Sequence, residues 1–263
     1  MKILCCVKRV PAPGAKINVT ADGQDVDAAH LGFTTSPHEE CAVEGAVQLI
    51  EEHGGEVTVL TLGTGDAEEQ LRYAVSVGAT HGVLVEADTI QWDPQRTAQA
   101  ITAAVQELEV DEPFDLIMFG NESADAGGFQ VGIRTAMALG RPIVQGIKGV
   151  EIGDDTITAR REIDGGFEVY KLPRPAVLGI KEGLNLPRYP TMKGRLASKK
   201  VELNSITASA AEGGQVRVKL HRPEETVSET VILGTGAEAD ALGRRPWAAR
   251  AQTTTRRSRR RSR

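Results

Sequence analysis

The chain has 263 residues, of which 40% are hydrophobic and 25% charged, and its formal net charge is −5. This length allows one large domain or two small ones with a buried core, and the composition is that of an ordinary globular protein. No run of about 18 apolar residues exists, which excludes a membrane-spanning helix, and the N-terminal segment lacks the cleavage site of a signal peptide.

The first predicted element is a buried strand over Lys2–Val7, which is almost entirely apolar. Its adjacent Cys5 and Cys6 point to opposite faces, and together with Cys41 they form an odd set without metal-ligand spacing. We therefore expect reduced thiols, no metal site and a cytoplasmic protein.

Residues 9–35 contain prolines and scattered polar residues without helical periodicity. They predict a long loop, with a hairpin formed by Lys16–Val19 and Asp25–Asp27. Loops of this length are uncommon unless they are functional.

Strands and helices then alternate. The first helix is marked by Ser36 as N-cap, Pro37 at the first helical position and Glu39 at N3, which form a capping box, and it ends at Gly54. The next elements are predicted as a strand over Glu56–Leu62, a helix over Asp66–Val77, a strand over His81–Glu86 and a helix that begins at Asp93-Pro94.

The following stretch combines a strand, Leu116–Phe119, with a polar glycine-rich loop and a helix. Free N–H groups at a helix N-terminus that follows a glycine loop suit an anion such as phosphate. An ordinary strand–helix connection is an equal alternative, since the loop is neither a Walker A motif nor a GxGxxG fingerprint. The helix is expected to have one apolar or small side formed by Ile133, Ala136, Met137 and Gly140.

Four strand–helix units in a row predict an α/β fold, in which a parallel sheet carries helices on both faces and has right-handed connections. Ligands of such sheets bind beyond the carboxyl ends of the strands, near the point where the strand order reverses. We therefore expect loops 8–14, 62–66 and 120–132 to meet in one crevice.

From Pro142 the pattern changes to short strands, which predict an antiparallel extension at the edge of the sheet. A loop over 182–198 then presents Tyr189, Met192 and Leu196 among charged residues, which indicates a contact surface, with a plain surface excursion as the alternative. The short strands are expected over Pro142–Glu151, Thr156–Glu162, Phe167–Leu172 and Ala176–Ile180.

Three regions are predicted along the chain. Residues 1–215 form one α/β domain, 216–243 a C-terminal extension with a strand over Thr226–Leu233, and 244–263 a disordered tail. The tail holds nine arginines and no acidic residue, which leaves a net charge of −14 on the first 243 residues. A role in nucleic-acid binding would therefore rest on the tail alone.

Several segments resemble the β subunit of electron-transfer flavoprotein, over residues 1 to about 215. The most specific is ARREIDGGFEVYKLPRPAVLGI at 159–180, where Glu162, Asp164-Gly165-Gly166, Glu168 and Pro175 fit the family signature. The supporting segments are CVKRV (6–10), SPHEECAVEGAV (36–47), SADAGGFQVG (123–132) and LNLPRYP (184–190).

The resemblance implies an electron carrier without catalytic residues, with the sheet type of the adenine-nucleotide α-hydrolases. It implies that AMP binds this subunit and that FAD is held mostly by an α subunit, with support from this chain. The implied nucleotide contacts are Cys6, Ser36, Pro37, His38, Glu39, Leu62, Asp125, Ala126, Gly127, Gly128, Phe129, Gln130, Val131, Gly132, Ile133, Arg134, Thr135 and Ala136.

The resemblance also implies docking partners. Acyl-CoA dehydrogenases of fatty acid oxidation, or other flavin dehydrogenases, would donate electrons, and a quinone oxidoreductase would pass them to the respiratory chain. The loop at 184–198 would be the family's recognition loop, with Met192 as its apolar anchor. The other expected partner contacts are Tyr189, Lys193, Arg195 and Leu196, of which the basic residues act mainly on encounter rate.

Three features depart from the family pattern. Val131 replaces a frequent threonine, as in electron-bifurcating relatives that hold a second FAD in place of AMP, yet the aspartate-rich aromatic loop of those relatives is not evident in DAGGFQV. Pro13 replaces an aromatic residue that lies near the flavin in some members. Residues after about 238 do not resemble the family's C-terminal arm, and the arginine-rich tail is typical of a changed reading frame.

Two alternatives of other classes remain open at this point. An ATP-using enzyme of the α-hydrolase class would need histidine or lysine motifs, and of the five histidines only His38 lies near the expected crevice. A nucleic-acid binder would use the arginine run of the tail, with strongly salt-dependent affinity.

Overall fold

The structure is a computed structural model, and it describes residues 1–87, 92–208 and 213–223. The chain divides into two units, Met1–His221 and Arg222–Arg263, and all described helices and strands belong to the first. The predicted strand over Thr226–Leu233 and the arginine-rich tail lie outside the described residues.

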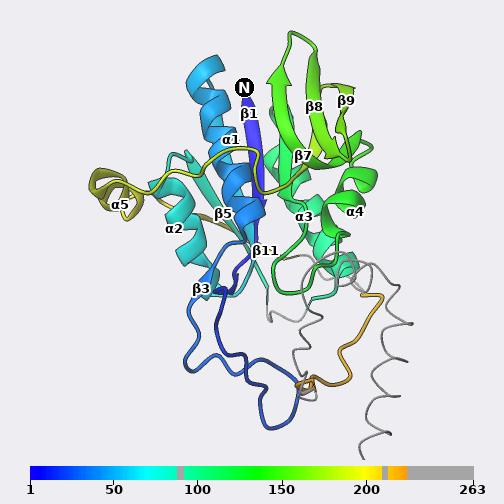
Figure 1. The fold of residues 1–263 in the computed structure, drawn as a ribbon. Helices are drawn as coiled ribbons and strands as arrows, with labels where there is room; N and C mark the ends of the chain where they lie inside the picture. Colours follow the sequence, from blue (N-terminus) through cyan, green and yellow to red (C-terminus); the bar gives the residue numbers. More distant parts are fainter. Residues whose placement is uncertain (88–91, 209–212, 224–263) are drawn as a thin grey trace, which may run out of the picture. The chain divides into compact units, whose positions relative to one another are not determined.

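A nine-stranded sheet forms the centre of the first unit, with the strand order β11-β5-β4-β1-β6-β10-β7-β8-β9 (Figure 1). Neighbouring strands are parallel from β11 to β7, and β8 and β9 continue the sheet antiparallel. The predicted parallel α/β sheet with an antiparallel extension is therefore confirmed. The strands are β1 (Lys2–Val7), β4 (Glu56–Gly63), β5 (His81–Glu86), β6 (Leu116–Gly120), β7 (Ile143–Ile152), β8 (Thr156–Ile163), β9 (Gly166–Pro173), β10 (Ala176–Ile180) and β11 (Asn204–Thr207).

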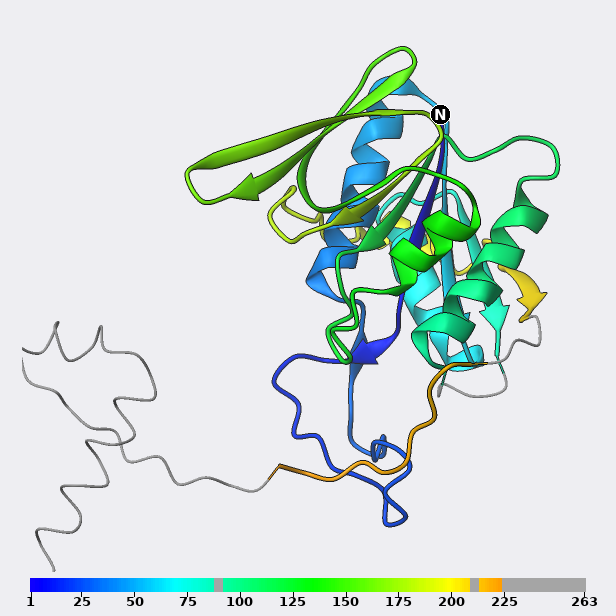
Figure 2. The same ribbon diagram turned by 90° about the vertical axis from the view of Figure 1, so that its right-hand side faces the viewer.

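Helices cover both faces of the sheet (Figures 1 and 2). The buried side chains form two hydrophobic clusters, one on each face of the sheet. Cys5 belongs to the first cluster and Cys6 to the second, so these neighbouring cysteines point to opposite faces as predicted. The first cluster contains α1 (Pro37–His53) and α2 (Glu68–Ser76), the second α3 (Pro94–Leu108) and α4 (Val131–Ala138), and a 3-10 turn over Gly65–Ala67 precedes α2.

The first turn of α1 is fixed by the predicted capping box. The Ser36 hydroxyl accepts a hydrogen bond from the Glu39 N–H at 3.4 Å, and the Glu39 carboxylate accepts one from the Ser36 N–H at 3.1 Å. These bonds satisfy two backbone groups that a helix start otherwise leaves without partners. Ser36 and Glu39 are both buried, so the box forms part of the core.

Two strand predictions were wrong or incomplete. Pro142–Glu151 and Ala176–Ile180 are predicted to belong to the antiparallel extension, but β10 lies between β6 and β7 and is parallel to both, so only β8 and β9 extend the sheet antiparallel. All five residues of β10 are buried, as expected for a central parallel strand covered on both faces. The edge strand β11 was missed, because only Ile206 among its four residues is buried and the apolar pattern is weak.

Two helix predictions also need correction. The loop expected over 182–198 contains a short helix, α5 (Met192–Ser198), whose N-cap Thr191 accepts a hydrogen bond from the Gly194 N–H at 3.0 Å. In α4 the expected apolar side is only partly the buried side, since Ala136 is buried but Ile133 is 41% and Met137 71% exposed. The buried positions are Gly132, Thr135 and Ala136.

The long segment after β1 folds on itself. Its ends pair as β2 (Val10–Pro11) and β3 (Phe33–Thr34), and an antiparallel bridge joins Val19 to Val26 within the predicted hairpin. Residues 217–220 contact this hairpin: the Gln24 side chain donates to the Val218 carbonyl at 3.0 Å, and the Leu220 N–H donates to the Gly23 carbonyl at 2.7 Å.

We predict that Ser36→Ala lowers the free energy of unfolding by about 1 kcal/mol, because the first turn of α1 loses its side-chain cap. Chemical denaturation of the two proteins measures the difference. Ser205→Ala on the edge strand β11 is the control and should change stability by less than about 0.5 kcal/mol. Equal effects of the two substitutions would show that the capping box does not stabilise α1.

Candidate functional site

The strand order reverses beside β1. The chain runs from β1 outward through β4 to β5 and then returns to β6 on the other side of β1. Because these strands are parallel, their carboxyl ends lie at one edge of the sheet, as the sequence predicts. In open α/β sheets this reversal point is where ligands bind.

The first turn of α1 contacts the end of β6 at this edge. A Cβ atom on Gly120 would lie 2.7 Å from Glu39 Cγ, so no other residue fits there without displacement. The Glu39 carboxylate accepts hydrogen bonds from the backbone N–H groups of Ser36 and Lys8. One buried side chain therefore joins α1, β6 and the residue that follows β1.

Burial also perturbs this carboxyl group. Removal from water raises the pKa of Glu39 to about 7, although the hydrogen bonds from Ser36 and Lys8 and the Lys8 charge act in the opposite direction. Burial likewise raises the pKa of the nearby Cys6 thiol, which therefore stays protonated and is no nucleophile.

The loop after β6 is tied to neighbouring segments by an ion pair of Lys8 with Asp125 and a hydrogen bond between His38 and Glu122. Lys8 Nζ lies 2.6 Å from the Asp125 carboxylate, and His38 Nε2 lies 3.3 Å from Glu122 Oε1. Partial burial acts to raise the pKa of Asp125, but Lys8 and further hydrogen bonds hold it below its usual value. The other ring nitrogen of His38 accepts the Glu182 N–H at 2.7 Å, so both nitrogens of this histidine are engaged.

The same loop has an unusual backbone. Gly127 has a φ of 54° and Phe129 a φ of 56°, and Phe129 is the one non-glycine residue with positive φ in the part of the chain that the structure describes. Gln130 next to it has a right-handed helical backbone conformation. Alternating left- and right-handed residues turn successive N–H groups to one side, which is an arrangement that binds anions.

The structure brings together part of the predicted nucleotide set. Cys6, Ser36–Glu39 and Asp125 gather around the reversal point, and Leu62 is the next-to-last residue of the neighbouring strand β4 at the same edge. The Ser36 hydroxyl is buried and used by the helix cap, and the Cys6 thiol is buried in the core. The contacts of Ser36 and Cys6 with a nucleotide stay predictions.

The remaining predicted residues extend away from this point along the loop and α4. Residues 126–130 cross the edge toward α3, where Gly128 comes near Pro94. Ile133 and Arg134 line a separate hollow of about 470 Å³ between α3 and α4. Thr135 is fully buried, and its hydroxyl has no hydrogen-bond partner among the described residues.

Sequence reasoning missed Lys8 as a site residue. Its ammonium group pairs with Asp125, and its N–H binds Glu39. A signal was present, because Lys8 directly follows the first strand and therefore had to lie at its carboxyl end. The sequence does not show that the Lys8 side chain faces the loop that contains Asp125, because the two residues lie 117 positions apart.

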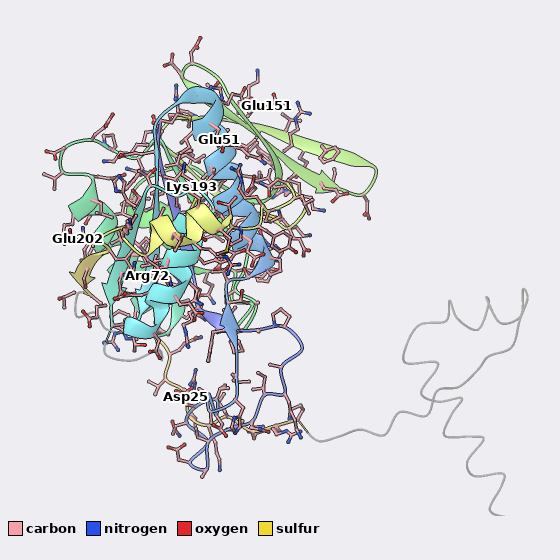
Figure 3. The ribbon with its side chains drawn as sticks, turned by 90° about the vertical axis from the view of Figure 1, so that its left-hand side faces the viewer. Asp25, Glu51, Arg72, Glu151, Lys193 and Glu202 are labelled. Carbon is pink, nitrogen blue, oxygen red and sulfur yellow. The ribbon has the colours of Figure 1, made fainter. Side chains whose placement is uncertain are left out.

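A second candidate site is the docking segment, which we define as residues 184–198. Tyr189 is 90% and Met192 74% exposed, and Leu196, Lys193 and Arg195 are exposed as well, so all five predicted partner contacts lie at the surface. Leu186 is 90% exposed and was missed. Figure 3 shows α5 lying across α2, with Lys193 labelled.

Neither a metal cluster nor a membrane span is found in the described residues. No group of three or more His, Cys, Asp or Glu side chains among residues 1–87, 92–208 and 213–223 is arranged to hold a metal ion. Within these ranges, no helix has both the length and the apolar character needed to cross a bilayer.

The sequence is similar to known proteins over most of its length. Residues 26–211 match the family model "Electron transfer flavoprotein domain". The chain is 38% identical to the electron transfer flavoprotein subunit beta of Syntrophomonas wolfei, over 81% of this chain and 82% of the relative. The corresponding protein of Bacillus subtilis is 32% identical, over 78% of this chain and 79% of the relative. The acryloyl-CoA reductase electron transfer subunit gamma of Anaerotignum propionicum is 32% identical, over 74% of this chain and 73% of the relative.

The raised pKa of Glu39 predicts a pH-dependent stability. The folded protein retains a proton between pH 4.5 and about 7 that the unfolded chain has lost, so stability should fall as pH rises through this window. The Glu39→Gln variant has no titratable group at this position. The stability of wild type minus that of Glu39→Gln should therefore decrease across the window, by at most about 3 kcal/mol.

Urea denaturation of both proteins at several pH values measures this difference. Glu52→Gln, at an exposed position of the same helix, is the control for the loss of one carboxyl group. A difference that stays constant from pH 4.5 to 7.5 would contradict the assigned protonation of Glu39.

Proposed function

Because this chain belongs to the electron transfer flavoprotein family and matches its β subunits, we propose that it binds AMP and helps an α subunit to hold FAD, while partner dehydrogenases dock on it. Its role is that of an electron carrier. The observation that carries this proposal is the meeting of α1, β1 and β6 at the reversal point of the sheet, beside a loop with anion-binding backbone geometry.

The crevice has the chemistry that an adenylate requires. The backbone N–H groups around Phe129 and Gln130 would hold the phosphate, and Lys8 supplies a positive charge at the same edge. Asp125 neutralises the Lys8 charge, so the phosphate would be held mainly by the backbone N–H groups of the loop.

FAD, when bound between the subunits, supplies the redox chemistry. No side chain of this subunit then needs to act as nucleophile or general base. The protonated Cys6 thiol and the fully engaged His38 ring are consistent with this role. They disfavour an ATP-using enzyme of the α-hydrolase class, in which a histidine would have to be free to meet the leaving pyrophosphate.

The docking segment would be the contact for flavin dehydrogenases. Its apolar side chains are exposed on a short helix and the loop before it, where the flexible thioether of Met192 adapts to different partners. Lys193 and Arg195 would speed encounter with an acidic surface. We propose acyl-CoA dehydrogenases of fatty acid oxidation as donors and a quinone oxidoreductase as acceptor. The three free cysteines agree with the reducing cytoplasm.

We predict that denaturing the purified αβ heterodimer releases one AMP and one FAD per dimer. Chromatography of the supernatant with nucleotide standards measures both. Release of two FAD and no AMP would instead identify an electron-bifurcating carrier, the alternative that Val131 suggests. Release of no adenine nucleotide other than one FAD would contradict the proposed AMP site.

We predict that Met192→Ala raises the KM of a partner dehydrogenase for the heterodimer about tenfold, because truncation removes a central apolar anchor. Flavin content should stay unchanged. Met137→Ala is a matched control, since Met137 is exposed to a similar degree on α4. An unchanged KM for Met192→Ala would exclude the docking segment as the contact.

A further inference from the structure

The N-terminal part of the docking segment is attached to α1 by one arginine. The Arg188 guanidinium donates to Glu44 at 2.8 and 3.0 Å and to Glu51 at 2.6 and 2.9 Å, and its backbone N–H donates to Glu44 at 3.1 Å. The hydrogen bonds to Glu51 and Glu44 raise the pKa of Arg188, and the bond from Arg188 lowers the pKa of Glu51. Such two-pronged, charge-assisted bonds fix geometry more firmly than a single contact between charges.

Burial makes this attachment stronger than an ordinary surface ion pair. Glu44 is only 4% exposed, so its carboxylate depends on Arg188 and on Gln48, which donates at 2.7 Å. Exposed pairs contribute little to stability, whereas a buried charge that loses its partner is costly. Glu51 lies two helical turns after Glu44, so both carboxylates project from one side of α1.

Neighbouring contacts hold the same part of the segment. Asn185 donates to the Cys41 carbonyl at 3.0 Å. Leu184 packs over Gly45, where an added Cβ would lie 2.9 Å from Leu184 Cδ2. The segment therefore lies directly on α1 at its beginning.

The C-terminal part of the segment is attached to α2. Arg72 donates to the Ser198 carbonyl at 3.0 Å, and Gly194 passes so close to the Ser76 carbonyl that an added Cβ would lie 2.2 Å from its oxygen. In Figure 3, α5 lies between the labelled Glu51 on α1 and Arg72 on α2. The exposed Tyr189 and Met192 thus lie between two fixed points.

We propose that Arg188 is a positioning residue for docking, which holds the exposed apolar side chains of the segment in their binding geometry without itself supplying the apolar contact. This inference rests on the proposed docking function. A segment that is ordered before binding loses less conformational entropy in the complex, so its partner binds more tightly. Arg188 therefore controls affinity for the dehydrogenase through the order of residues 184–198.

The test uses the purified αβ heterodimer and four variants. Arg188→Met removes the guanidinium bonds to Glu44 and Glu51 but keeps the backbone N–H bond to Glu44. Arg188→Lys retains the charge without the planar fork, and Glu51→Gln weakens one half without leaving the buried Glu44 alone. Glu52→Gln is the matched control, because Glu52 is an exposed glutamate next to Glu51 whose one ionic contact in the described part of the chain is with His53. If Arg188→Met fails to fold, the Lys and Gln variants carry the test.

Two measurements are made on each variant. Hydrogen–deuterium exchange of peptides from 184–198 should speed up about tenfold in Arg188→Met and about two- to fivefold in Glu51→Gln. In Glu51→Gln, which keeps the buried Glu44 paired, peptides from α1 should exchange as before. The KM of a flavin dehydrogenase for the heterodimer should rise in the same order, with kcat and flavin content unchanged. The exchange rate and the KM of Arg188→Lys should lie between those of the wild type and of Arg188→Met.

The outcomes separate this inference from the docking function. Unchanged exchange in Arg188→Met, or faster exchange with an unchanged KM while Met192→Ala still raises KM, would show that Arg188 does not position the segment for docking. If neither Arg188→Met nor Met192→Ala alters KM, the docking function itself is wrong and the positioning role with it. Parallel increases in exchange and KM, absent in Glu52→Gln, support the proposal.

Discussion

The close approach of α1 to the end of β6 is the contact on which the candidate site depends. Gly120 leaves room for the Glu39 side chain, which in turn binds the backbone on either side of the crevice. A carboxyl group buried in this way is costly unless it is hydrogen-bonded or protonated, and here both conditions contribute. The rigid capping box of α1 and the irregular loop over 121–130 therefore meet at the reversal point of the sheet.

Helix α1 joins the two candidate sites. Its first turn, with His38 and Glu39, contacts the crevice, and its later turns, with Glu44 and Glu51, hold the docking segment. His38 also accepts the backbone N–H of Glu182, at the point where the chain leaves β10 for the docking segment. A single rigid helix thus sets the distance between the place proposed for a nucleotide and the place proposed for a protein partner.

The sequence was a good guide wherever local chemistry determines structure. The capping box at Ser36, the buried run of β1 and the strand–loop–helix unit around Gly120 follow from residue types and spacing alone. The position of β10 did not follow, because its fully apolar run fits a central strand as well as a hairpin strand, and only long-range pairing decides between them. The pairing of Lys8 with Asp125 and of Arg188 with Glu44 joins residues more than 100 positions apart, and no local pattern records such a contact.

The outermost strand, β9, has a consequence for the chain before it meets another subunit. Edge strands offer free backbone groups on which a second sheet can grow, and here Phe167 and Val169 add exposed apolar side chains near the hairpin tip. Toward its other end the same strand carries Lys171 and Pro173, a charge and a residue without an N–H, which both oppose such growth. Sheet growth is thus opposed by charge and proline at the base of the hairpin, whereas near its tip the charge of Glu168 alternates with two exposed apolar side chains.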